Sequence, residues 1–167
     1  MAIEQDMMAT TAVALGAVDA GDELLSALEG RSNILLMTQQ AEEAVLRPAD
    51  VGAWPSALRI VLAARIAAIN ELHDLARHYN EMDDSAEYRD LASPENDGHA
   101  LGLSHVIAYM DNVAARPRDI RADDIRVLQE NGVTDADIVR LTELNAFMAY
   151  QVRLISAVSL MSENDNG

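Results

Sequence analysis

Near the middle of the chain, four polar residues have the types and the spacing that chemistry requires. Glu71, Asp74 and His78 occupy positions i, i+3 and i+7, so a helix places them on one face. Carboxylates and imidazoles on one face suit several divalent metal ions or an acid–base pair. We therefore predict Glu71, Asp74 and His78 as metal ligands, and His78 with His73, which lies off that face, as catalytic residues. The same pattern also fits a solvated, charged helix face.

The apolar residues around this set predict the helices that must position it. Seven of them recur at steps of three and four and mark a buried face: Leu58, Leu62, Ile66, Ile69, Leu72, Ala76 and Tyr79. Asn70 interrupts the run, and asparagine is a poor interior helix residue but a good N-cap. We therefore expect one helix at 56–69 and a second at 71–82, with Glu71 and Asp74 in the positive first turn of the second. One continuous helix of about 25 residues is the alternative.

The rest of the chain shows helical spacing and stop signals, with no pattern typical of strands. The sequence predicts an all-α bundle of about seven helices in a single domain over 1–167. Its N-terminal helices lie in 1–30, and a polar tail at 162–167 is expected to fray. The expected helices outside the central pair are 3–18, 22–29, 32–47, 99–115, 119–132 and 134–161. The segment 48–53 is an expected loop, and 83–98 is expected to be mostly loop with at most one helical turn.

The composition excludes several functions. The chain has 28 acidic residues against 12 basic ones, a net charge of −16, and every basic residue is an arginine. A nucleic acid needs a basic stripe, so we do not expect one as a partner. Without lysine there is no Schiff-base chemistry, and without cysteine there is no disulfide, thiol redox step or Cys-ligated metal.

The location is expected to be the cytoplasm. The first residues, Met1 to Asp6, are acidic where a signal peptide is basic. We find no apolar run of the roughly 18 residues that span a bilayer, so no membrane partner is expected. The arginine-only, alanine-rich usage is typical of a GC-rich bacterial genome.

Three segments, 59–78, 116–139 and 143–153, carry a resemblance to a known family. In their order and spacing, the region 38–161 resembles the alkylhydroperoxidase D-like/carboxymuconolactone decarboxylase superfamily. The first segment is similar to the family's signature helix pair and the second to its later helix–turn–helix. The third, with Gln151 and Arg153, resembles the closing helix, where an amide and an arginine commonly stand close together. The resemblance implies an all-α homo-oligomer, either a dimer, a trimer or a hexamer.

The departures from the family concern its redox residues. Redox members carry a glutamate, then Cys-x-x-Cys, then a histidine four residues on. In a gapless register on His78, the cysteine positions fall on Glu71 and Asp74 and the glutamate position falls on Arg59. His73 matches a histidine that some members place between the cysteines. Peroxide reduction in those members needs a reactive thiolate and a resolving thiol, so thiol peroxidase activity is expected to be absent.

The replacement of an acid and two thiols by one base and two acids suggests an ion-pair network. In it, Arg59 pairs with Glu71 or Asp74 and holds the two helices together. The leading expectation is a cysteine-less member repurposed to bind a small molecule or metal, with Arg59 and Arg153 as anion anchors and no cofactor. The alternatives are a cofactor-free decarboxylase or lyase with His78 as acid–base, and a purely structural oligomeric protein.

Overall fold

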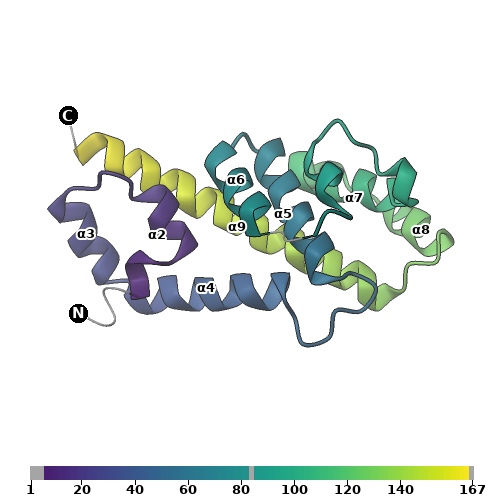
Figure 1. Ribbon diagram of the computed structural model, residues 1–167, viewed down its shortest axis with the longest axis horizontal. Helices are drawn as coiled ribbons and strands as arrows, with labels where there is room; N and C mark the ends of the chain where they lie inside the picture. The colour runs from purple at the N-terminus through teal and green to yellow at the C-terminus, as the bar shows by residue number, and fades with distance from the viewer. Residues whose placement is uncertain (1–5, 83–84, 166–167) are drawn as a thin grey trace. The chain divides into compact units, whose positions relative to one another are not determined.

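A computed structural model describes residues 6–82 and 85–165, and within these ranges all regular structure is helical and no strand occurs. The predicted all-α class is therefore confirmed. The α-helices in these ranges are α2 (Thr11–Gly16), α3 (Asp22–Glu29), α4 (Ser32–Leu46), α5 (Ser56–Ile69), α6 (His73–Met82), α7 (Ser104–Ala115), α8 (Ala122–Glu130) and α9 (Asp135–Asp165) (Figure 1). Short 3-10 helices are η1 (Arg89–Ala92), η2 (His99–Leu101) and η3 (Pro117–Asp119).

The sequence predicts one domain over 1–167, and within the chain two compact units can be distinguished. The described residues within Met1–Ala44 and Tyr150–Gly167 make one unit, called here the terminal unit. Those within Val45–Ala149 make the other, called the central unit. Helix α9 contributes its first half to the central unit and its second half to the terminal unit.

Helix α5 is the core of the central unit. Every residue from Leu58 to Ala67 is buried, and α6, η1 and α7 all pack against this helix. An α-helix that is apolar on all sides must be surrounded, because it has no face suited to water. Two arginines, Arg59 and Arg65, are buried within the same run, so each needs polar partners inside the unit.

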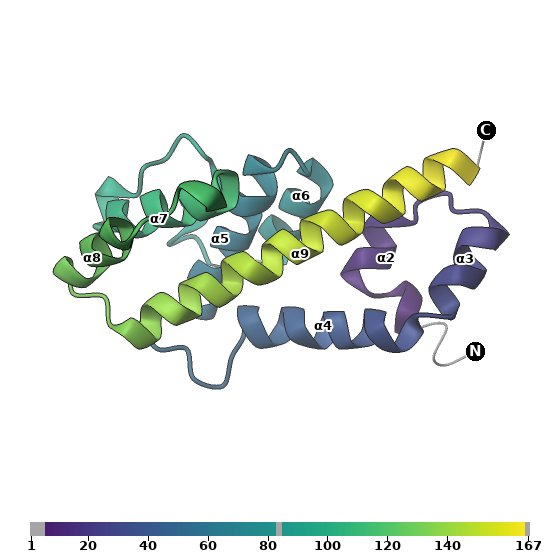
Figure 2. The ribbon, with the colours of Figure 1, turned by 180° about the vertical axis from the view of Figure 1, so that it is seen from behind.

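In the terminal unit, α2 lies between α4 and the second half of α9 (Figure 2). The Thr11 amide donates to Oε1 of Gln39 on α4 at 2.7 Å. On the α9 side the backbones approach closely, since a Cβ added at Gly16 would lie 2.9 Å from the Cβ of Val158. Glycine is therefore required where α2 crosses α9.

The helix break at Asn70 is confirmed, but its geometry differs from the prediction. Asn70 is the C-cap of α5 rather than an N-cap, and its side-chain amide donates to the Ile66 carbonyl at 2.8 Å. Glu71 follows in the left-handed conformation, with φ 62°. The Glu71 amide donates to Ala68 O at 3.0 Å, and the Leu72 amide donates to Ala67 O at 3.0 Å. These two bonds form a Schellman motif, with Glu71 at the position where glycine is usual.

Other boundaries also depart from the sequence predictions. The helix expected at 3–18 is interrupted at Ala9 and Thr10, before α2 begins, and its residues 3–5 lie outside the described part. The helix expected from His99 begins only at Ser104, because Gly102 adopts a φ of 69°. By contrast, the segment 83–98 agrees with its prediction, because its described residues are mostly loop with the one short turn η1; residues 83–84 are outside the described part.

The tail expected to fray from residue 162 is instead helical as far as Asp165, while 166–167 lie outside the described residues. Ser162 is buried and donates to the Val18 carbonyl at 2.6 Å, so the last turns of α9 are held in the terminal unit. By length and composition alone, the segment Asp135–Asn164 could cross a membrane. This differs from the expectation that no such segment exists, although core helices of soluble proteins pass the same test.

Candidate functional site

The structure does not bring the predicted metal ligands together. Glu71 precedes α6 in a left-handed conformation and so leaves the helical register that would align it with Asp74 and His78. Asp74 is exposed and pairs with Arg77 at 2.9 Å. Across residues 6–82 and 85–165, no group of three or more His, Asp or Glu side chains is arranged to hold a metal ion.

The two predicted catalytic histidines lie in different surroundings. His73 is the first residue of α6 and is exposed. His78 is half-buried, and its ring meets the edge of the Tyr79 ring at a centroid separation of 5.4 Å and an interplanar angle of 61°. This T-shaped contact is a packing arrangement, since aromatic rings prefer it in cores.

The contacts of Arg59 differ from those of the predicted ion-pair network. This arginine is 3% exposed, and its guanidinium donates to backbone carbonyls rather than to Glu71 or Asp74. Nε reaches Trp54 O at 2.9 Å, Nη1 reaches Val45 O at 3.1 Å and Nη2 reaches Val51 O at 3.2 Å. Val45 lies in the last turn of α4, so Arg59 caps that helix end, where a cation is favoured.

Burial lowers the pKa of the Arg59 guanidinium, and nearby Arg140 lowers it further. The group stays charged, because arginine remains protonated in proteins. Arg153, the other predicted anion anchor, is exposed on α9 in the terminal unit.

Asp137, in the first turn of α9, joins that helix to the loop before α5. Its Oδ1 accepts from the Ala53 amide at 3.0 Å, and its own carbonyl accepts from Nε1 of Trp54 at 2.9 Å. Thr134 and Arg140 also donate to the carboxylate, at 2.7 and 3.1 Å. The pKa of Asp137 is lowered, chiefly by the Ala53 hydrogen bond and against the opposing effect of burial.

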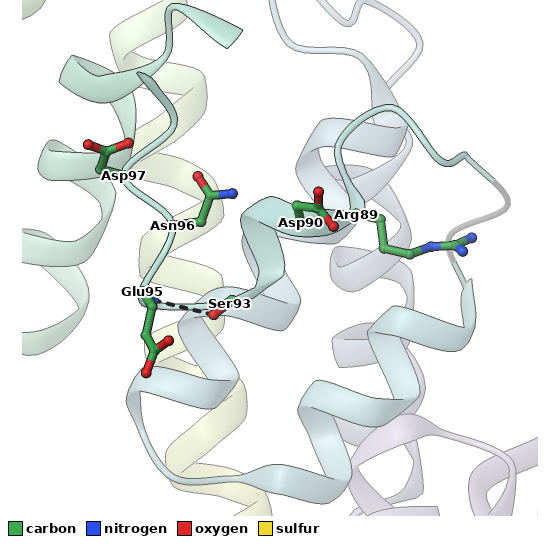
Figure 3. Close-up of a pocket in the computed structure, with 6 residues that line it drawn as sticks. All are labelled: Arg89, Asp90, Ser93, Glu95, Asn96 and Asp97. Carbon is green, nitrogen blue, oxygen red and sulfur yellow. Dashed lines mark hydrogen bonds between the residues drawn. The ribbon is translucent and has the colours of Figure 1, made fainter. Parts of the chain in front are cut away.

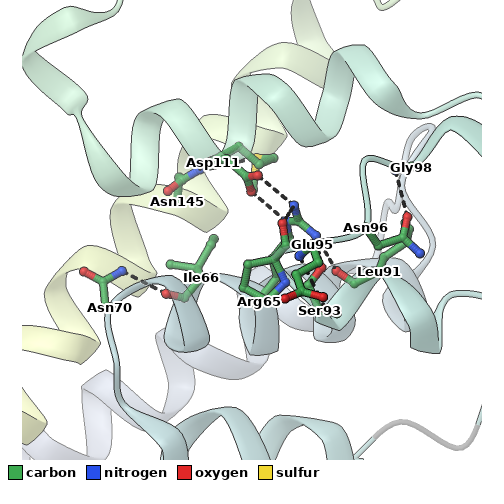
Figure 4. A network of polar contacts seen from close by, with 12 residues as sticks. Arg65, Ile66, Asn70, Leu91, Ser93, Glu95, Asn96, Gly98, Asp111 and Asn145 are labelled. Carbon is green, nitrogen blue, oxygen red and sulfur yellow. Dashed lines mark hydrogen bonds and ion pairs between the residues drawn. The ribbon is translucent and has the colours of Figure 1, made fainter.

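Arg65 makes several buried hydrogen bonds through its side chain, and it is not among the site residues predicted from the sequence (Figure 4). Nε and Nη2 donate to the two carboxylate oxygens of Asp111 on α7, at 2.6 and 2.7 Å. Nη1 donates to the carbonyls of Leu91 and Ser93, and Nη2 also donates to Pro94 O at 3.1 Å. The sequence feature that could have identified Arg65 is its position within a mostly apolar helix, since a charge that is buried there must find partners.

The loop held by Arg65 borders an open depression of about 720 Å³ (Figure 3). Its lining is polar and consists of Arg89, Asp90, Ser93, Glu95, Asn96 and Asp97. Figure 3 shows the three carboxylates spread around the depression rather than pointing toward one another. Three lining side chains are already used by the loop itself. Ser93 accepts from the Glu95 amide at 3.4 Å, and Asn96 and Asp97 accept from the Gly98 and His99 amides, both at 2.9 Å. The arrangement therefore stabilises a turn and does not form a cation site.

Two buried polar side chains of the terminal unit are incompletely bonded. Gln151 is 1% exposed, and neither its amide nitrogen nor its amide oxygen has a hydrogen-bond partner among the described residues. The Oε2 atom of Glu42 is also buried without a hydrogen bond, although Glu42 makes other contacts. A buried amide without partners costs free energy unless water or another group satisfies it.

Exposed apolar side chains gather on the terminal unit. Ile34 and Met37 on α4 are 46% and 62% exposed, and with Ala41 and Ala44 they form a run at steps of three and four, called here the α4 stripe. Tyr150 lies beside it, because its hydroxyl bonds Oγ1 of Thr38 at 3.0 Å. Among the described residues of this unit, the exposed large apolar side chains are Met8, Val18, Ile34, Met37, Tyr150, Leu160 and Met161.

In the comparisons with known proteins, no family model, no curated protein and no solved structure matches this chain. The resemblance to the alkylhydroperoxidase D-like superfamily therefore stays a prediction that rests on the sequence segments alone.

Proposed function

We propose that this chain acts through assembly: it is a helical protein that associates with a second copy of itself through the α4 stripe. The observation that carries the proposal is the row of exposed apolar residues on α4, because a soluble helix normally presents polar residues there. Tyrosine and methionine are enriched in protein interfaces, and Met37 and Tyr150 supply them beside this row.

The stripe has a size pattern that suits two-fold pairing. Its first half carries the large side chains Ile34 and Met37, and its second half carries the small ones, Ala41 and Ala44. In a two-fold dimer the same patch meets itself, so two α4 helices running in opposite directions place large residues of one copy against small residues of the other. The contact is then filled on both sides without overlap.

The residues at the border of the stripe are also compatible with a second copy. Asn33 and Gln40 are exposed on its outer side, and both are neutral. The whole chain carries a net charge of −16, so two copies repel each other at long range. Association through this contact should therefore strengthen when salt screens that repulsion.

Sedimentation velocity over a range of protein concentrations tests the proposal. The wild-type chain is expected to form dimers, more so at high salt, and Met37→Glu is expected to remain monomeric. The matched control is Val127→Glu, which places the same charge at an exposed apolar position on α8. A monomeric wild-type chain, or dimers of Met37→Glu equal to wild type, would refute self-association through the stripe.

The absence of thiol peroxidase activity is part of the same proposal, because the chain has no cysteine to form a thiolate. Purified protein given hydrogen peroxide and a dithiol is expected to consume no more peroxide than buffer does. The proposed location is the cytoplasm, which cell fractionation tests.

A further inference from the structure

Methionines supply all the sulfur of this chain. The sequence has eight of them and no cysteine, so an oxidant that attacks sulfur meets only thioethers. Met110 and Met148 are fully buried, whereas Met8, Met37 and Met161 are 41%, 62% and 47% exposed. An oxidant in solution reaches exposed sulfur first, and Met37 is the most accessible of these five residues.

Met37 has a position that the other exposed methionines lack. It lies in the α4 stripe between Ile34 and Ala41, which are exposed one turn before and one turn after it. Met8 precedes α2 and Met161 lies on α9, so neither belongs to the stripe. A change at Met37 therefore alters the surface through which the chain is proposed to associate, whereas a change at Met8 or Met161 does not.

The turn of α4 that carries Met37 is fixed by its neighbours. Thr38 is buried, and its hydroxyl bonds the Tyr150 hydroxyl on α9 at 3.0 Å. Oε1 of Gln39 accepts from the Thr11 amide at the start of α2, at 2.7 Å. The Met37 side chain itself faces solvent, so water can hydrate a polar atom added to its sulfur. Modification of this side chain is therefore expected to leave the terminal unit folded.

We propose that Met37 is an oxidation site that controls self-association; this inference rests on the proposed dimer. A hydroperoxide transfers one oxygen atom to the Met37 sulfur, so that the O–O bond breaks and an S–O bond forms. The sulfur gives up two electrons. The proton of the transferred oxygen passes to the departing oxygen, which leaves as water or as an alcohol. The product, methionine sulfoxide, is polar where the thioether was apolar.

The sulfoxide does not suit the proposed contact. In the antiparallel pairing of two α4 helices, Met37 of one copy faces Ala41 of the other, and an alanine methyl offers no hydrogen-bond donor. The sulfoxide oxygen therefore loses its water without replacement, and two-fold symmetry repeats this cost at both ends of the contact. We expect a dimer dissociation constant about a hundredfold higher, from about tenfold for each copy. Because the dimer covers Met37, the oxidant reacts with single copies and traps them.

Sedimentation velocity before and after hydrogen peroxide tests this control, with mass spectrometry to locate the added oxygen. Wild-type dimers are expected to dissociate as Met37 is oxidised, and a methionine sulfoxide reductase should restore them. Met37→Leu should stay dimeric in peroxide, whereas a Met8→Leu/Met161→Leu double variant should dissociate like wild type. Circular dichroism checks that the helices persist. Dimers that persist with Met37 oxidised would overturn this inference alone, whereas an untreated monomeric wild type would refute the proposed self-association as well.

The rate of oxidation provides a second measurement, which needs no variant. At low protein concentration, where single copies dominate, Met37 is expected to be oxidised at least as fast as Met161. As the concentration rises through the range of dimer formation, the rate at Met37 should fall. The rate at Met161 should stay constant, because Met161 lies on α9 and outside the α4 stripe. Rates that are independent of concentration at both positions would overturn the proposal.

Discussion

The guanidinium of Arg65 and the carboxylate of Asp111 face each other through two parallel hydrogen bonds, of 2.6 and 2.7 Å. The Arg65 side chain is 1% exposed, whereas the Asp111 side chain is 31% exposed. This pair joins α5 to α7, and the Arg65 guanidinium also donates to the carbonyl of Leu91 in η1 and to that of Pro94 in the loop after it. One buried charge therefore fixes three segments of the central unit.

Loss of the Asp111 carboxylate should destabilise the protein strongly. Asp111→Ala leaves the buried Arg65 charge without its counter-ion, at an expected cost of about 3 kcal/mol in the free energy of unfolding. The control is Asp74→Ala, which breaks the exposed pair with Arg77 and should cost no more than about 1 kcal/mol. Urea denaturation measures both, and similar values for the two variants would contradict the assigned role of Arg65.

Arg59→Met should also be costly, although the predicted partners of Arg59 were wrong. The variant removes three donors from the carbonyls of Val45, Val51 and Trp54, and we expect a loss of about 3 kcal/mol. Glu71→Gln should leave the stability nearly unchanged, because Glu71 is exposed. A double-mutant cycle that finds coupling between positions 59 and 71 would argue for the ion pair after all.

Glu71→Gly should stabilise the protein. A non-glycine residue at φ 62° carries a strain of roughly 1 kcal/mol, which glycine releases. The end of α8 provides a matched site: Gly132 has φ 84°, and the amides of Gly132 and Val133 make the same pair of bonds as those after α5. Gly132→Ala should therefore destabilise the protein by about the amount that Glu71→Gly stabilises it. Thermal unfolding of both variants measures this, and changes of equal sign would contradict it.

The lowered pKa of Asp137 makes stability depend on pH in acid. The folded-state pKa lies below the ordinary value of 3.8, so protons bind more tightly to the unfolded chain. The stabilisation is therefore complete above the ordinary pKa and is lost as the pH falls through the folded pKa. Asp137→Asn should lower stability at neutral pH and flatten this acid dependence, and a slope equal to that of wild type would contradict the role given to Asp137. Unfolding curves between about pH 2 and pH 7 provide the measurement.

Gln151→Met should raise stability by about 1 kcal/mol, because it replaces an unpaired buried amide with an apolar side chain of similar shape. The melting temperature measures the change. A lower melting temperature would mean that the amide is satisfied in solution, by an ordered water or a bound molecule. Exposed Gln40→Met provides the control for the effect of methionine itself.

The sequence by itself determined the helical class and most helix positions, and it predicted a break at Asn70 with one continuous helix as the alternative. These features depend on local information: apolar spacing, stop residues and the bonds that an asparagine makes to its own helix. It also excluded thiol chemistry, because that depends only on the absence of cysteine.

Only the tertiary structure decided what the charged residues do. The shared face of Glu71, Asp74 and His78 required an unbroken helical register, and the left-handed turn at Glu71 removes it. Arg65 finds Asp111 across 46 positions of the chain, and spacing along one helix carries no information about such a partner. Periodicity identifies which residues are buried, whereas the partner of a buried charge depends on which segments fold against it.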